Sequence, residues 1–162
     1  MAIRNIRLEG DEILKKKSKP VDEINEKILT LIDDMFETMY SQNGVGLAAV
    51  QVGVLKRVIV IDLGEEDSEQ YVLINPKIIK TKGTQEVDEG CLSFPNKFAK
   101  VIRPKEVIVE ALNENGEKIT IKGKDMLAQA IMHECDHLEG EVFVDKIIEG
   151  TLEVVNPNNN KN

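Results

Sequence analysis

Residues 124–138, with the sequence KDMLAQAIMHECDHL, combine the apolar spacing of an α-helix with the only two histidines of the chain. His133 and His137 are four residues apart, so a helix would place both imidazoles on one face, within reach of one metal ion. Glu134 follows the first histidine, and its carboxylate can act as a base toward a water molecule that the metal activates. The stretch therefore predicts a central helix that supplies part of a metal site.

Composition restricts the class of protein. Of the 162 residues, 41% are hydrophobic and 31% are charged, as expected for one globular domain spanning residues 1–162. No apolar run is long enough to span a bilayer, and the start, MAIRNIRL, lacks the apolar core of a secretory signal, so we expect a cytoplasmic protein. The net charge of −8 argues against DNA or a membrane as partner, because both are anionic. The lysines of residues 15–19 are a local exception that can touch RNA phosphates, although such a cluster is more often a solvated patch.

The periodicity of apolar residues predicts an α+β fold. Helical spacing over residues 21–40 predicts an N-terminal amphipathic helix that ends at Asn43 and Gly44. β-Branched or alternating runs predict strands at residues 57–63, 71–75, 106–112, 117–122 and 151–155. The polar ending, residues 156–162, is expected to be a disordered tail. This order of elements indicates mostly antiparallel β-sheets around the central metal-binding helix.

Two imidazoles hold a metal weakly, and catalytic metal sites usually have three protein ligands and one open position. In one large group of His-Glu-x-x-His proteases a third histidine follows the second by six residues, but here that position is Phe143. A carboxylate from a second downstream helix is also disfavoured, because only 22 residues follow Gly140 and they have the pattern of a strand and a tail. Cysteine is the remaining donor.

The two cysteines differ in their positions. They can form one disulfide, but neighbouring histidines in a cytosolic chain favour metal binding by at least one of them. Cys135 lies about 200° around the helix from both histidines, so it would face away from them as a small apolar group. Cys91 lies in EGCLS, residues 89–93, where glycine permits a tight turn and the thiol can project from a loop. We favour an open Cys-His-His site over a closed site with a fourth protein ligand.

A further feature is the small-residue stretch GVGLAAVQ at residues 44–51. Taken alone, it is best explained as a connection between a helix and a strand that allows close packing. A phosphate-binding loop is unsupported, because no Gly-Lys-Ser or Gly-Lys-Thr follows. Gln51 nevertheless offers a neutral amide donor, which is the kind of group that stabilises an oxyanion.

Taken together, residues 44–51, 89–93 and 133–137 resemble the three motifs of the peptide deformylase family, in the same order and at similar spacing. The resemblance extends from the N-terminal segment to about residue 145. It implies an enzyme that removes the formyl group from the N-terminal formylmethionine of new bacterial polypeptides. Iron(II) is the usual metal of this family, and zinc, nickel or cobalt can occupy the site.

The resemblance also implies roles for individual residues. Cys91, His133 and His137 would bind the metal, and Glu134 would be the general base and then the general acid. Met132 stands where many relatives have glutamine, and this departure would alter hydrogen bonding behind the metal.

Other residues are expected to contact the substrate. By resemblance, Gln51 and the backbone N–H of Leu92 would hold the developing oxyanion, and the backbone of Gly46 would pair with the substrate peptide. Helix geometry adds an apolar slot for the methionine side chain, lined by Val45, Met126 and Ala130.

The expected partner is the formylmethionyl N-terminus of a nascent chain. Some bacterial members have a long C-terminal helix implicated in ribosome docking; it is missing here, which puts ribosome attachment by that route in doubt and leaves a transient contact. Two alternatives stay open at this point. One is a small metallopeptidase of ordinary amide bonds that shares only the His-Glu-x-x-His chemistry, and the other is a non-catalytic metal-binding homologue.

Overall fold

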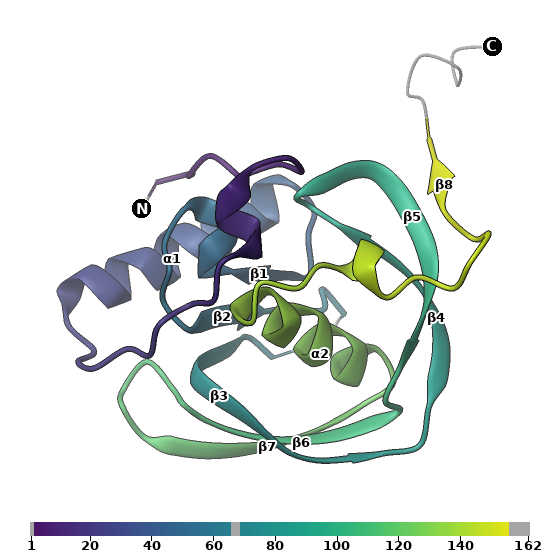
Figure 1. The fold of residues 1–162 in the computed structure, drawn as a ribbon. Coiled ribbons are helices and arrows are strands. Elements are labelled where there is room, and N and C mark those ends of the chain that lie inside the picture. The colour runs from purple at the N-terminus through teal and green to yellow at the C-terminus, as the bar shows by residue number, and fades with distance from the viewer. Residues whose placement is uncertain (1, 66–68, 156–162) are drawn as a thin grey trace.

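The computed structural model describes residues 2–65 and 69–155. Within these residues there are two α-helices and eight strands. The strands form two antiparallel sheets, and α2 lies between the sheets (Figure 1). None of the helices in this part of the chain is long and apolar enough to cross a membrane. In chain order the elements are η1 (Glu12–Lys15), α1 (Glu26–Ser41), β1 (Gly46–Ala48), η2 (Ala49–Val52), β2 (Val58–Ile61), β3 (Tyr71–Lys82), β4 (Gln85–Cys91), β5 (Phe94–Arg103), β6 (Glu106–Leu112), β7 (Lys118–Lys124), α2 (Met126–Leu138), η3 (Phe143–Asp145) and β8 (Glu153–Val154).

The larger sheet has the strand order β1-β2-β3-β6-β7. At β2 it is covered by α1 on one face and by α2 on the other. All four residues of β2 are buried, which explains its unbroken β-branched sequence. Val58 and Val60 pack with the buried side of α1, whereas Ile59 and Ile61 pack with α2. This strand therefore joins the two apolar clusters and fixes α2 against the sheet.

The smaller sheet has the order β4-β5-β8 and curves around the other side of α2 (Figure 1). β4 and β5 pair along most of their length and are joined by the two-residue turn at Leu92 and Ser93. Cys91 is therefore the last residue of a strand, and the expectation that it projects from a loop is corrected. A strand end held by its neighbour fixes the thiol more firmly than a loop would.

The predicted N-terminal helix is present but shorter than expected. It begins at Glu26, because the Asn25 side chain accepts a hydrogen bond from the backbone N–H of Ile28 at 3.1 Å and so caps the first turn. Val21, expected inside the helix, is held outside it by two hydrogen bonds between its backbone and the Asn75 side chain. The predicted end is close, since the helix stops at Ser41 and Asn43 adopts a positive φ of 56°.

The predicted mixed fold with antiparallel sheets is confirmed, and the hairpin of residues 106–122 and the short strand near residue 153 are both present. The strand expected at residues 71–75 continues to Lys82, and β4 and β5 had no counterpart among the predicted strands. The predicted tail, residues 156–162, lies outside the described residues.

Candidate metal centre

Three side chains from two elements converge beside α2. His133 and His137 lie one turn apart on the same side of the helix, with ring centroids 5.1 Å apart. Cys91, at the end of β4, brings its Sγ to 3.3 Å from Nε2 of His137. One donor atom from each residue lies within 4.8 Å of the others. The structure thus brings together the three side chains that the sequence suggests as metal ligands.

The second cysteine lies elsewhere. Cys135 packs against the apolar cluster between α2 and the larger sheet, as its position on the helix indicates. Burial raises the pKa of this thiol to about 12, so it stays protonated at neutral pH. Both cysteines are free, and no disulfide joins them.

The donor chemistry fits a divalent ion of the zinc and iron class. A thiol and two imidazoles are ligands that such ions accept, whereas magnesium and calcium prefer oxygen. Nδ1 of His133 donates to Oε2 of Glu89 at 2.8 Å, which leaves Nε2 of that ring as the atom able to bind a metal. Three protein donors would leave a position free for water or substrate, which suits catalysis better than a purely structural role.

Glu134 lies next to this group in a buried position. Its side chain is 4% exposed, and its Oε1 has no hydrogen-bond partner among the described residues. Burial raises the pKa of this carboxyl to about 7. Gly46 makes room for it, because a Cβ at that position would lie 2.6 Å from Oε2 of Glu134. A glycine is therefore required at position 46 for the carboxylate to reach this place.

Gln51 connects the stretch of residues 44–51 to the stretch of residues 89–93. Its Oε1 accepts from the backbone N–H of Ala48 at 3.0 Å, which fixes the amide orientation. Its Nε2 donates to Oγ of Ser93 at 3.1 Å and lies 3.5 Å from Sγ of Cys91. Gly44 allows a similar close approach, because a Cβ there would lie 2.7 Å from Cδ1 of Leu92. The amide is thus held beside the thiol and the Leu92 turn.

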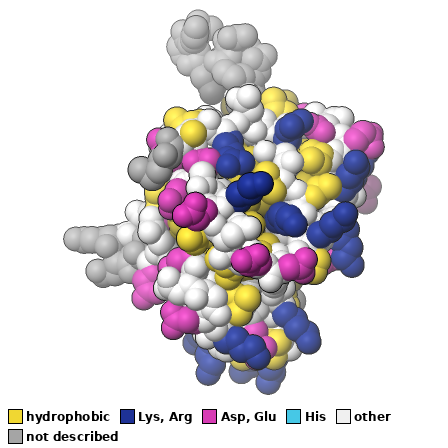
Figure 2. Space-filling view, turned by 90° about the vertical axis from the view of Figure 1, so that its left-hand side faces the viewer, with side chains coloured by type: hydrophobic (Ala, Val, Ile, Leu, Met, Phe, Trp, Pro, Cys, Tyr) yellow, Lys and Arg dark blue, Asp and Glu magenta, His cyan; other side chains and the backbone are white. Residues whose placement is uncertain are grey.

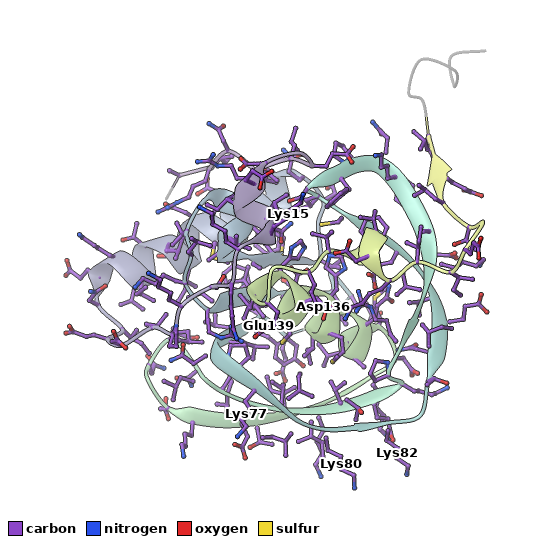
Figure 3. All side chains as sticks on the ribbon, in the orientation of Figure 1. Lys15, Lys77, Lys80, Lys82, Asp136 and Glu139 are labelled. Atoms are coloured by element: carbon purple, nitrogen blue, oxygen red, sulfur yellow. The ribbon has the colours of Figure 1, made fainter. Side chains whose placement is uncertain are left out.

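Behind the histidines lies a buried network of charges that the sequence did not suggest. Arg103 is 2% exposed and contacts two carboxylates. Its Nη2 donates to Oε2 of Glu89, and its Nη1 donates to Oδ2 of Asp136 at 2.6 Å. Asp136 lies on α2 (Figure 3) and also accepts from Nζ of Lys146 at 3.0 Å. Burial would raise the pKa of Glu89, but hydrogen bonds and charge from His133 and Arg103 outweigh it and lower the pKa to about 2.

Only part of this network had a signal in the sequence. Glu89 and Asp136 each lie two residues or fewer from a candidate ligand, which is where supporting carboxylates are common. Arg103 is distant in sequence from the three motifs and precedes Pro104 at the end of a strand, so only the pairing of β4 with β5 brings it to Glu89.

A cleft of about 540 Å³ opens over the donor group. It is lined by nine of the ten candidate residues, and His137 lies fully buried beneath it. The nine are Val45, Gly46, Gln51, Cys91, Leu92, Met126, Ala130, His133 and Glu134. The outer parts of the lining are apolar, since Val45 and Met126 remain 41% and 49% exposed. A larger hollow of about 750 Å³ beside the start of α1 contains neither cysteine nor histidine, so the chemistry belongs to the smaller cleft.

Fold and site together define a class, that of α+β proteins with the metal centre of a His-Glu-x-x-His hydrolase. The profile of the polypeptide deformylase family matches residues 3–152, and the chain belongs to that family. It is therefore an enzyme of the kind that removes formyl groups from polypeptide N-termini with the help of a metal ion.

Comparison with individual proteins supports the same family assignment. The peptide deformylase of Acetivibrio thermocellus is 60% identical over 148 residues, which cover 91% of this chain and 85% of that protein. Peptide deformylase 1 of Clostridium acetobutylicum is 57% identical over 149 residues, covering 92% and 97% of the two chains. The crystal structure of a peptide deformylase from Legionella pneumophila is similar with a TM-score of 0.88 and 45% identity, covering 91% and 88%. One from Ehrlichia chaffeensis, in complex with actinonin, gives a TM-score of 0.89 at 39% identity, covering 92% and 91%.

Proposed function

We propose that the cleft removes the formyl group from the N-terminal formylmethionine of nascent polypeptides in the cytoplasm, releasing formate. The observation that carries this proposal is the convergence of the three sequence stretches on one cleft. Cys91, His133 and His137 would hold one divalent ion, for which we propose iron(II), with zinc, nickel or cobalt as substitutes that the same donors accept. When bound, the ion would polarise the formyl carbonyl and increase the acidity of a water molecule.

Glu134 is proposed as the residue that moves the proton. Its carboxylate is buried at the floor of the cleft beside His133, and one of its oxygens is without a hydrogen-bond partner among the described residues. It would accept a proton from the attacking water and deliver it to the nitrogen of the departing amine. The peptide then leaves with a free N-terminus.

Three groups of the chain are proposed to orient the formyl carbonyl and the peptide. Nε2 of Gln51 would turn from Ser93 to the oxygen that gains negative charge, and the backbone N–H of Leu92 would donate to the same atom. The backbone of Gly46 would pair with the peptide, since its lack of a side chain keeps the space beside Glu134 open. The side chain of the substrate methionine would lie in the apolar slot formed by Val45, Met126 and Ala130.

The change of Glu134 to Gln tests this proposal. We expect turnover of formyl-Met-Ala-Ser to fall by about 10²–10⁴-fold while the metal content stays the same, because the amide cannot take the proton. Glu139→Gln is the matched control, since Glu139 is the exposed residue that directly follows the same helix, and it pairs with Arg57. Metal analysis of anaerobically purified protein, with the assay on the same sample, identifies the ion.

A matched peptide without the formyl group separates the alternatives. Cleavage of its internal amide bonds would replace the proposed reaction with that of a metallopeptidase. A filled coordination shell, together with no turnover of either peptide that Glu134→Gln could reduce, would indicate a non-catalytic homologue.

A further inference from the structure

The outer face of the larger sheet is basic although the chain carries a net charge of −8. On this face six lysines of β3 and β7 flank two glutamates of β6, an excess of four positive charges. We call this surface the lysine face, and it consists of Lys77, Lys80, Lys82, Lys118, Lys122 and Lys124, all of them exposed. Figure 2 shows Lys and Arg side chains gathered at the lower end of the molecule, where Figure 1 places these strands.

Most of these ammonium groups are not neutralised locally. Lys124 lies 3.3 Å from Glu106, the one ion pair found for the lysine face among the described residues. The other five lysines have no carboxylate oxygen within 4.0 Å in that part of the chain. The N-terminal lysine cluster is smaller: of its four lysines, Lys17 pairs with Glu139, which also binds Arg57, and the other three have no carboxylate oxygen within 4.0 Å among the described residues. An anionic partner would therefore gain more from the lysine face than from that cluster.

The positive charge is concentrated at one end of the face. Four of the lysines, Lys80, Lys82, Lys122 and Lys124, line a shallow hollow of about 150 Å³ together with a single carboxylate, that of Glu106. The opposite end adjoins the hairpin turn, which carries the acidic residues of positions 114 and 117. An extended anion would thus bind at the end around the hollow.

This end of the face is close in sequence to residues of the cleft, but it lies on the other side of the sheet. β7 ends at Lys124, and α2 begins two residues later at Met126, which lines the cleft. α2 covers the inner face of β6 and β7, whereas Lys80 and Lys82 project from the lower edge of the molecule, away from α2 (Figure 3). A partner bound to the lysines would leave the cleft accessible.

We propose that the lysine face docks on the phosphate backbone of RNA. Lysine is a point-charge partner for phosphate, and flexible lysines on a sheet can follow a backbone without reading its bases. RNA is the polyanion at which nascent chains are made, so the choice of RNA rests on the proposed function. A lipid surface is disfavoured, because few apolar side chains, Ile79 and Ile108 among them, are available here for insertion. The face also consists of strands and has no amphipathic helix that could lie in a membrane surface.

The test measures binding of a fluorescent RNA duplex of about 20 base pairs at several salt concentrations. We expect the triple variant Lys80→Gln, Lys82→Gln, Lys122→Gln to bind about tenfold or more weakly at low salt. The slope of log affinity against log salt should shrink by about 2 to 3, because each lost phosphate contact removes nearly one released counterion. Turnover of formyl-Met-Ala-Ser should not change, since none of the three residues lines the cleft.

The matched control removes the same charge elsewhere, with Lys15→Gln, Lys16→Gln and Lys27→Gln, and should alter RNA affinity by less than about twofold. Equal losses in the two triple variants, or no binding of the duplex by the unaltered protein, would overturn the proposal. It is overturned as well if phosphatidylserine vesicles or polyglutamate bind more tightly than the duplex. Absence of turnover with intact RNA binding would instead refute the proposed function and leave the docking surface in place.

Discussion

The two sheets of this protein bury different kinds of side chain. The buried residues on the strands of the larger sheet are all apolar, and they pack with α1 and α2. The smaller sheet packs only four buried apolar residues in its own cluster, and its inner side carries Glu89, Ser93 and Arg103. Apolar burial stabilises a fold without regard to chemistry, whereas buried charge is costly unless it is paired. The comparison indicates that the larger sheet supplies stability and the smaller one positions the metal site.

The largest effect is expected at the end of β4. Cys91→Ser should weaken metal binding by more than about 100-fold, because the loss of a ligand should cost more than the roughly 10–100-fold that the loss of an outer supporting group costs. Metal content after dialysis and activity towards a formylated peptide measure it. Cys135→Ser is the control and should leave both nearly unchanged, because that thiol faces the apolar cluster of the larger sheet. Equal metal loss in the two variants would refute the ligand assignment.

A change behind the metal should affect stability and metal binding together. Arg103→Met leaves the carboxylates of Glu89 and Asp136 buried without their shared cation, which we expect to lower the free energy of unfolding by about 3–5 kcal/mol. Metal affinity should fall by about 10–100-fold, since Glu89 orients His133. Urea unfolding and a metal titration measure the two effects.

Lys100→Gln is the control for Arg103→Met. It breaks an exposed pair with Asp88 on the same sheet, and it should leave stability and metal affinity nearly unchanged. The assigned role of the smaller sheet would be wrong if the two variants bound metal equally well.

A change in the larger sheet should separate stability from function. Ile59→Ala removes a fully buried side chain of β2, and we expect the free energy of unfolding to fall by about 2–5 kcal/mol. Metal affinity and turnover per folded molecule should stay as they are, measured at a temperature where the variant remains folded. Ile79→Ala, on an exposed position of β3, should change neither quantity. Loss of metal in folded Ile59→Ala would break the division of roles between the sheets.

The same division explains how far the sequence predicts the molecule. Regular periodicity marks α2 and the β6–β7 hairpin, because each has a clear apolar side, whereas β2 is marked by an unbroken β-branched run, because it is buried on both faces. β4 and β5 are harder to predict, since their inner positions hold Glu89 and Arg103 where a strand pattern calls for apolar residues. The candidate ligands lie in short motifs, but the Arg103 contacts depend on strand pairing that no local pattern contains. The lysine face was likewise hidden by a net charge that averages over the whole surface.

The smallest effect concerns acid stability. The pKa of Glu89 is lowered from 4.5 to about 2, so its contribution to stability is present above pH 4.5 and is lost as the pH falls towards 2. In metal-free protein, the free energy of unfolding of Glu89→Gln should depend less steeply on pH over this interval, by up to about 1.4 kcal/mol per pH unit. Urea unfolding between pH 5 and 2 measures the slopes. Asp88→Asn is the control, because that neighbouring carboxylate has a side chain 81% exposed. Equal slopes in the unaltered protein and Glu89→Gln would contradict the assignment. A difference would place part of the acid sensitivity in the smaller sheet, since no buried residue on the strands of the larger sheet is a carboxylate.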